Sequence, residues 1–243
     1  MRLERFLADC GVATRSDLKT IIRKGRVSVD GVPVRDPGMQ IRQGESRIAL
    51  DGKEMSWRKQ LIFLMNKPAG VITATEDSKQ PTVLDLLPET VRRMGLFPVG
   101  RLDRDTEGLL LLTNDGHLAH ALLAPKKHVD KLYEAVLDAE PESGAEARFL
   151  AGIGLADGTR CRPAVLERLP MLSEGNPVAR VTIVEGKFHQ VKRMFAAIGS
   201  HVLFLKRLRI GPVSLDPGLK PGDFRPLTQD EQQALNRQTG LDF

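Results

Sequence analysis

The chain has 243 residues, of which 41% are hydrophobic and 28% charged, a composition typical of a globular protein that can bury a core. No apolar run approaches the roughly 20 residues of a membrane-spanning helix, and none follows the N-terminus as a signal peptide would require. These features favour a cytoplasmic protein. Cys10 and Cys161 lie far apart and fit no metal or redox spacing, so we expect free thiols and no metal site.

Positive charge is concentrated in two parts of the chain, whose formal net charge is +5. Residues 1–42 carry nine Lys and Arg against five Asp and Glu, and residues 180–209 carry seven against one. Clustered cations attract polyanions, so these two zones predict a polyanionic partner that contacts both ends of the chain.

The first 50 residues predict two short helices followed by a tight hairpin. Leu3, Phe6 and Leu7 have the spacing of one helix face. Gly25 would end a second helix, and alternating valines on both sides of Asp30-Gly31 are a strong hairpin signal. Such a small unit has little core, so we expect an appended module.

Three short runs in this segment carry a family resemblance: Arg2-Leu3, Thr14-Arg15-Ser16 and the run from Gly25 to Gly31. They resemble the S4 domain, a small RNA-binding module of ribosomal proteins and RNA enzymes, over residues 2 to about 48. In S4 domains the second helix and the following loop present basic side chains to RNA. The matching positions here are Arg15, Lys19, Arg23, Lys24 and Arg26.

A second, larger domain is predicted to follow a polar linker at residues 51–60. The apolar run at 61–65 is typical of a buried strand, and Val71–Thr73 would resume it after a break. Further strands are predicted at residues 109–113, 133–137 and 178–184.

Three helices are predicted in this larger domain. One follows Gly116 and stops before Pro125. A second has apolar residues at helical spacing, and a third is capped by Thr228 with Glu231. The apolar residues of the second are Val191, Met194, Phe195 and Ile198. Strands and helices are mixed without regular βαβ alternation, so we predict an α+β fold.

A charged loop between Gly100 and Gly108 runs directly into the predicted strand at 109–113. It holds Asp103 between Arg101 and Arg104, and nearby cations keep a carboxylate ionised and available as a nucleophile or base. Taken alone, the loop is also compatible with an ordinary turn, because Asp, Thr and Gly are common turn residues.

The 17 residues from Gly100 to Gly116 match almost completely the signature of the pseudouridine synthases, and they resemble the RsuA-type subfamily in particular. Other matching segments are Leu64–Gly70, Lys131-Leu132-Tyr133, Glu185–Phe195, Ile210–Val213 and Gly222–Thr228. Leu132 departs from relatives, which often carry a small polar residue there. The resemblance implies an S4-like RNA-binding domain at 1–50, a linker at 51–60 and a catalytic domain at 61–243 with a mixed, mostly antiparallel sheet.

The resemblance also implies residue roles. Asp103 corresponds to the family nucleophile, which attacks the target ribose or is otherwise required to break the N-glycosidic bond. The freed uracil then rotates and is rejoined through C5. Tyr133 corresponds to the aromatic residue beside the flipped base, and Lys192 to the basic partner of the aspartate, with Arg193 as the alternative. No cofactor or metal is expected, because nothing is oxidised, hydrolysed or phosphorylated.

Exposing a nucleotide from a duplex costs a few kcal/mol, which contacts with the RNA backbone must offset. Charge placement and the resemblance together predict RNA-binding roles in this domain for Arg101, Lys187, Arg193, Arg207 and Arg209. We expect the protein to act on ribosomal RNA as a monomer.

Three alternatives remain open. The run from His189 to Met194, with Phe195 and the arginine-rich segment after it, resembles small-subunit (16S) enzymes more than large-subunit (23S) enzymes. The predicted substrate is therefore 16S rRNA, and 23S rRNA is the alternative. A non-catalytic ribosome-assembly factor would need only the S4-like module and has no use for Asp103 and Tyr133. A glycoside hydrolase using Asp103 and Asp105 is disfavoured, because two carboxylates in one loop need not reach the required separation.

Overall fold

The computed structural model describes residues 1–10, 12–13, 15–42, 45–55, 60–124, 127–170 and 175–241. The chain divides into two compact units, Met1–Lys59 and Gln60–Phe243. Within the described ranges, no helix has the length and apolar character needed to cross a membrane.

The described residues of the first unit form two helices and four short strands. Their bounds are α1 (Leu3–Asp9), α2 (Arg15–Arg23), β1 (Val27–Val29), β2 (Val32–Val34), β3 (Ile48–Leu50) and β4 (Lys53–Met55). The strands form an antiparallel sheet in the order β2-β1-β3-β4. Leu3, Phe6 and Leu7 pack in one core with Leu18 and Ile22. The predicted helix pair and the hairpin at Asp30-Gly31 are confirmed.

The structure differs from the predicted linker at residues 51–60. Strand β4 lies inside that range and pairs with β3 around a turn at Asp51 and Gly52, both of which have positive φ. The Asp51 carboxylate accepts hydrogen bonds from the Arg26 guanidinium, at 2.9 Å from Nε and 2.5 Å from Nη2. A polar sequence can form an edge strand, which is why composition alone suggested a linker. Residues 56–59 lie outside the described residues.

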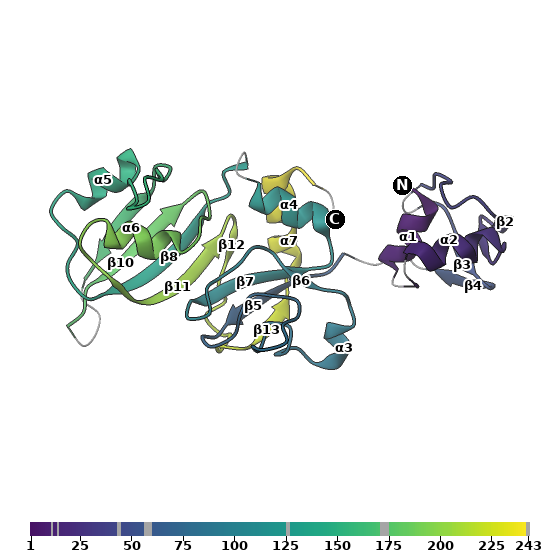
Figure 1. The fold of residues 1–243 in the computed structure, drawn as a ribbon, viewed down its shortest axis with the longest axis horizontal. Helices are drawn as coiled ribbons and strands as arrows, with labels where there is room; N and C mark the ends of the chain where they lie inside the picture. Colours follow the sequence, from purple (N-terminus) through teal and green to yellow (C-terminus); the bar gives the residue numbers. More distant parts are fainter. Residues whose placement is uncertain are drawn as a thin grey trace. The chain divides into compact units, whose positions relative to one another are not determined.

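The second unit is built on one large sheet with helices on both faces (Figure 1). Its elements are β5 (Ile62–Lys67), α3 (Glu89–Arg92), β6 (Phe97–Pro98), β7 (Glu107–Thr113), α4 (Gly116–Leu123), β8 (Lys131–Leu137), α5 (Ala145–Ala151), β9 (Val165–Leu169), β10 (Val178–Ile183), α6 (Gln190–Ala196), β11 (Val202–Ile210), β12 (Val213–Ser214), β13 (Phe224–Pro226) and α7 (Gln229–Thr239).

The nine-stranded sheet has the order β13-β5-β7-β11-β8-β10-β9, with β6 beside β7 and β12 beside β11. Among these strands the pairing of β7 with β11 is parallel, and the others are antiparallel. The predicted α+β class is therefore confirmed. The strand predicted at Val71–Thr73 is wrong: Ile72 forms one isolated bridge to Thr82. Instead, the Thr73 hydroxyl bonds the loop at Leu102.

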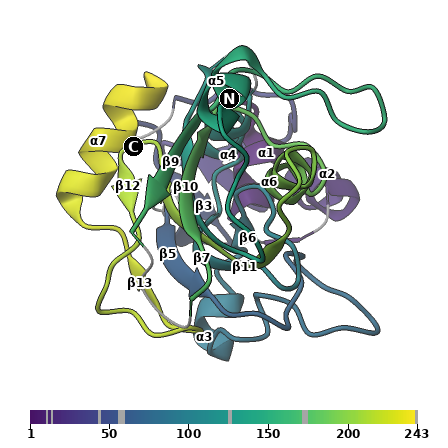
Figure 2. The same ribbon diagram turned by 90° about the vertical axis from the view of Figure 1, so that its left-hand side faces the viewer.

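Strand β7 is buried on both faces. Leu110 and Leu112 belong to the core under α5 and α6, whereas Leu109 and Leu111 belong to the core under α4 and α7. Figure 2 shows α7 on one side of the strands and α6 on the other. A strand covered on both faces reads as a continuous apolar run, which explains the four consecutive leucines.

The two halves of the sheet meet where β7 and β11 run side by side. Their parallel register pairs Lys206 with Glu107 and Arg207 with Gly108. Gly108 has φ +99°, and a Cβ atom there would lie 2.3 Å from the Arg207 carbonyl oxygen. Only glycine therefore fits at this point.

We expect Gly108→Ala to destabilise the protein by at least about 3 kcal/mol, because the added carbon both strains the backbone and separates the two strands. Gly116→Ala is the matched control: Gly116 lies at the start of α4, and nothing lies within 4 Å of the added carbon. It should be neutral or slightly stabilising. Urea denaturation of both variants measures the difference. Equal stabilities would contradict the role given to Gly108.

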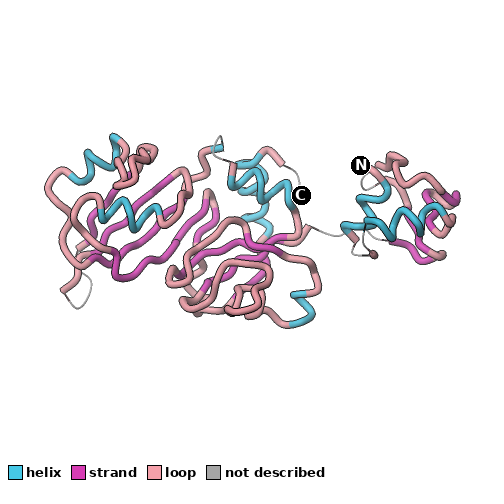
Figure 3. Tube along the Cα trace, in the orientation of Figure 1, coloured by secondary structure: helices cyan, strands magenta, loops and turns pink. Residues whose placement is uncertain are grey.

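Apart from α3 and β6, the chain between β5 and β7 is largely loop (Figure 3), and this segment carries Asp103. A buried lysine supports it. Lys67, at the end of β5, is fully buried and donates hydrogen bonds to the carbonyl oxygens of Pro68, Arg104 and Thr106. Burial lowers the pKa of Lys67 to about 8, although the charges of nearby carboxylates, led by Asp105, oppose the shift.

The lowered pKa of Lys67 predicts a pH dependence of stability. Between about pH 8 and the ordinary lysine pKa, the unfolded chain binds the proton more readily than the folded chain, so the free energy of unfolding rises with pH. Relative to Lys67→Met, the wild-type protein should gain about 2 kcal/mol between about pH 7.5 and 9.5. Urea denaturation at the two pH values tests this.

The control for this experiment is Lys220→Met, which removes an exposed lysine of the same unit and should keep the wild-type pH profile. A Lys67→Met profile parallel to the wild-type profile would show that Lys67 titrates normally.

Candidate active site

The loop that carries Asp103 is tied down on both sides of that residue. The Thr73 hydroxyl donates to the Leu102 carbonyl (2.8 Å) and accepts from the Leu102 amide (3.1 Å). The Gly70 amide donates to the Arg104 carbonyl (2.8 Å), and Arg104 Nε donates back to the Gly70 carbonyl (3.1 Å). Because its neighbours are fixed, the backbone of Asp103 is held in place.

The Asp103 carboxylate is partly exposed and faces two side chains of the segment around α6. His189 Nε2 lies 3.5 Å from Oδ1, and Lys192 Nζ lies 3.8 Å from Oδ2. Lys192 makes a shorter contact of 2.6 Å with Asp105 Oδ1, and this hydrogen bond holds the pKa of Asp105 below its usual value. Lys192 is thus shared between two carboxylates of the loop.

Arg193, the alternative partner of Asp103, points elsewhere. Its Nη2 lies 2.5 Å from Asp157 Oδ2, and its Nη1 donates to the Phe188 carbonyl at 3.4 Å. Hydrogen bonds from Thr159 and Arg193 lower the pKa of Asp157 to about 2. The geometry therefore favours Lys192 as the neighbour of Asp103.

Tyr133 lies across from Asp103 on β8 and is 7% exposed. Arg207 of β11 donates from Nη1 to the Tyr133 hydroxyl (3.3 Å) and from Nε to the Leu109 carbonyl (2.7 Å). Its guanidinium carbon is 5.9 Å from the centre of the tyrosine ring, within cation–π range. Arg207, for which an RNA-binding role was predicted, is 2% exposed and holds the Tyr133 hydroxyl group in place.

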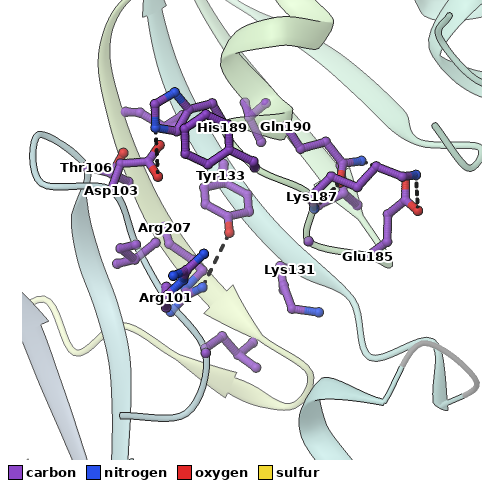
Figure 4. Close-up of a pocket in the computed structure, with 18 of the residues that line it drawn as sticks. Arg101, Asp103, Thr106, Lys131, Tyr133, Glu185, Lys187, His189, Gln190 and Arg207 are labelled. Carbon is purple, nitrogen blue, oxygen red and sulfur yellow. Dashed lines mark hydrogen bonds and ion pairs between the residues drawn. The ribbon is translucent and has the colours of Figure 1, made fainter. Parts of the chain in front are cut away.

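Asp103, Tyr133 and Lys192 all line one open cavity of about 480 Å³ (Figure 4). This volume is typical of small-molecule sites, which span roughly 300–1,000 Å³. The charged lining residues are Arg101, Lys131, Lys187, Lys192 and Arg207 against Asp103 and Glu185. A cavity with this excess of cations suits an anionic ligand.

Lys131 is a cavity residue to which the sequence assigned no role. It is 8% exposed, and Nζ donates to the Val129 carbonyl at 2.8 Å. Burial and the charge of Arg207 lower the pKa of Lys131 to about 8. Figure 4 shows Lys131 on the other side of the Tyr133 ring from Asp103.

Lys187 also lines the cavity, and its ammonium group is paired with the carboxylate of Glu185. Its Nζ lies 2.6 Å from Glu185 Oε2, and Glu185 also accepts a hydrogen bond from Gln190 at 2.8 Å. These contacts stiffen the turn that leads into α6.

The other predicted RNA-binding residues differ in their surroundings. Lys19, Arg23, Lys24 and Arg101 are exposed and have no carboxylate partner within the described parts of the chain. Arg26 is paired with Asp51, and Arg209 contacts Asp130 at 2.7 Å and lies outside the cavity lining. The side chain of Arg15 lies outside the described residues.

Sequence reasoning missed the placement of three residues: Lys67, Lys131 and His189. Each lies in a segment that resembles a family motif, so the sequence pointed to these segments, but no role was predicted for the three residues themselves. Among the described residues, no group of His, Cys, Asp and Glu is arranged to hold a metal ion.

Comparison with known proteins agrees with this geometry. Residues 61–197 match the family model of RNA pseudouridylate synthase, and residues 1–46 match the S4 domain. The chain is 44% identical to an uncharacterized RNA pseudouridine synthase, YtzG, of Bacillus subtilis, over 97% of this chain and 98% of the relative. It is 40% identical to the ribosomal small subunit pseudouridine synthase A of Escherichia coli, over 95% and 98% of the two chains.

A solved structure agrees as well. The crystal structure of a pseudouridylate synthase superimposes with a TM-score of 0.68 at 37% identity, and the match covers 97% of this chain and 99% of that one. On these matches, the chain belongs to the RNA pseudouridine synthase family, as an isomerase with an N-terminal S4 domain.

Proposed function

We propose that this pseudouridine synthase converts one uridine of small-subunit (16S) ribosomal RNA, with Asp103 as the nucleophile. Two findings support this substrate. The chain is 40% identical to an enzyme named for the small ribosomal subunit, and the run from His189 to Phe195, with the arginine-rich segment after it, resembles the small-subunit type. A ribosomal RNA substrate is also consistent with the predicted cytoplasmic location and with action as a monomer.

The observation that carries the role of Asp103 is its position. Its carboxylate stands at a cavity large enough for a nucleotide, on a loop fixed at Leu102 and Arg104. A nucleophile on a fixed backbone approaches the ribose in a defined geometry, which lowers the entropic part of the barrier. The Asp103 carboxylate attacks C1′ of the ribose, and the N-glycosidic bond breaks as uracil leaves with the bonding electrons on N1. The freed uracil turns, and its C5 attacks C1′ and displaces Asp103. The C5 proton then leaves while N1 takes up a proton.

The neighbouring residues take supporting roles in this proposal. Tyr133 packs beside the flipped uracil, because its ring lies in the cavity and Arg207 fixes its hydroxyl group. Lys192 places positive charge beside Asp103 and can approach it more closely, since its present partner Asp105 is mostly exposed. The exposed cations of α2, together with Arg101, hold the RNA backbone.

The proposal is tested by tritium release from C5-labelled uridine in 16S and 23S rRNA. We expect about one equivalent from 16S alone, and none with Asp103→Asn. Lys192→Met should lower kcat about a hundredfold, a loss typical of removing one electrostatic group from an active site. Arg193→Met should change kcat by less than about threefold, since its partner is Asp157.

Other outcomes separate the alternatives. Release from 23S rRNA would keep the mechanism and change the substrate. Release by Asp103→Asn at even a few per cent of the wild-type rate would exclude Asp103 as the nucleophile. No release from any RNA would favour a non-catalytic assembly factor.

The binding role of α2 predicts a change in salt dependence. Each phosphate neutralised on single-stranded RNA contributes about −0.7 to the slope of log K against log salt. Replacing Lys19, Arg23 and Lys24 with Gln should therefore reduce the slope by about 2, measured by filter binding across a salt series. The charge-matched control replaces Arg92, Arg93 and Arg148, which pair with carboxylates elsewhere, and should leave the slope unchanged.

A further inference from the structure

An aromatic side chain stands exposed at the entrance to the cavity. Phe188 is 69% exposed, the highest value among the large hydrophobic side chains of the described residues. Its ring stacks on the imidazole of His189, with centroids 3.8 Å apart and planes inclined by 19°. Single exposed apolar residues are common on proteins, so exposure alone carries no conclusion.

The backbone beneath Phe188 supplies a second observation. His189 has φ +48°, a left-handed conformation that residues other than glycine seldom adopt. This conformation brings His189 Nε2 to 3.5 Å from the Asp103 carboxylate (Figure 4), so the ring stacked on it stands beside the nucleophile. The turn is stiff, because buried Gln190 accepts from the Lys187 amide at 2.9 Å and donates to Glu185 at 2.8 Å.

Phe188 and Tyr133 both line the cavity, but they can meet different parts of an RNA. Tyr133 is 7% exposed and meets only a base that has entered the cavity. Phe188 presents an open ring outside, where it meets a base that stays in the strand. Extruding a nucleotide leaves the face of its neighbour unstacked, and an aromatic side chain can cover that face.

We propose that Phe188, backed by His189, stacks on the RNA base adjacent to the target uridine while that uridine occupies the cavity. The inference rests on the proposed function, because it requires a target uridine inside an RNA strand. Stacking of this kind accepts any base, since every base has a flat π face. Phe188 thus holds the strand in register with Asp103 rather than reading its sequence.

The test uses full-length protein and 16S rRNA carrying C5-tritiated uridine. Stacking of a base on an aromatic ring implies that Phe188→Ala lowers kcat/KM about tenfold to a hundredfold. Phe188→Trp keeps a flat ring and should stay within about threefold of wild type. Phe188→Leu keeps apolar bulk without a ring and should lose nearly as much as Phe188→Ala. Phe204→Ala is the control, since Phe204 is 38% exposed and lies outside the cavity lining.

A second readout does not depend on turnover. For this readout, the target uridine is first located in 16S rRNA. An RNA oligonucleotide that spans it, with 2-aminopurine at the adjacent position, is then bound to Asp103→Asn. Stacking on Phe188 quenches its fluorescence, so the double variant Asp103→Asn/Phe188→Ala should give a brighter complex. A structural role for Phe188 would not produce this pattern, nor the rescue by tryptophan.

Two results would overturn the inference while the proposed function stands, provided that the wild-type protein releases tritium. One is a kcat/KM of Phe188→Ala within twofold of the wild-type value, and the other is full activity of Phe188→Leu. Absence of release by the wild-type protein from every RNA would overturn the proposed function, and the inference with it.

Discussion

Strands β7 and β11 approach each other so closely at Gly108 that no side chain fits between them. This contact joins the two halves of the sheet. Asp103 precedes β7, whereas Tyr133 lies on β8, beyond β11. Arg207 on β11 donates hydrogen bonds to both the Leu109 carbonyl and the Tyr133 hydroxyl. The contact between β7 and β11 therefore also fixes the distance between the loop that carries Asp103 and Tyr133 on the other side of the cavity.

Positive charge in this protein serves two different purposes, and burial separates them. Lys67 and Arg207 are buried and donate hydrogen bonds to backbone carbonyl groups, so their charge holds the chain in place. Lys19, Lys24 and Arg101 are exposed without carboxylate partners in the described parts of the chain, so their charge is available to a phosphate backbone.

Much of the fold could be predicted from local patterns. The hairpin at Asp30-Gly31, the strand of consecutive leucines and the C-terminal helix capped by Thr228 all appear in the structure, because each has a strong local cause. Strand β11 was not predicted. Its pairing with β8 shifts register at two points, and buried Arg207 lies in its middle, so its sequence lacks the regular alternation of a strand.

The candidate site likewise has features that the sequence predicted and features that it did not. The motif residues Asp103, Tyr133 and Lys192 come together at one cavity, as the resemblance led us to expect. The burial of Lys67 could not be predicted, because lysine is normally exposed and its three carbonyl acceptors come together only in the folded chain. The sharing of Lys192 with Asp105 likewise depends on where α6 lies relative to the loop.

The four leucines of β7 have a consequence for how the second unit unfolds. Alternate side chains of this one strand belong to two separate hydrophobic cores, on opposite faces of the sheet. If either helical layer separates from the sheet, one face of β7 becomes exposed while the other face is still covered by the second layer. Local opening occurs in regions with few buried apolar contacts. The centre of β7 is not such a region, because its four leucines are fully buried. The two layers are thus coupled into one cooperative unit, and the nucleophile loop, which runs directly into that strand, is attached to the part of the sheet that opens last.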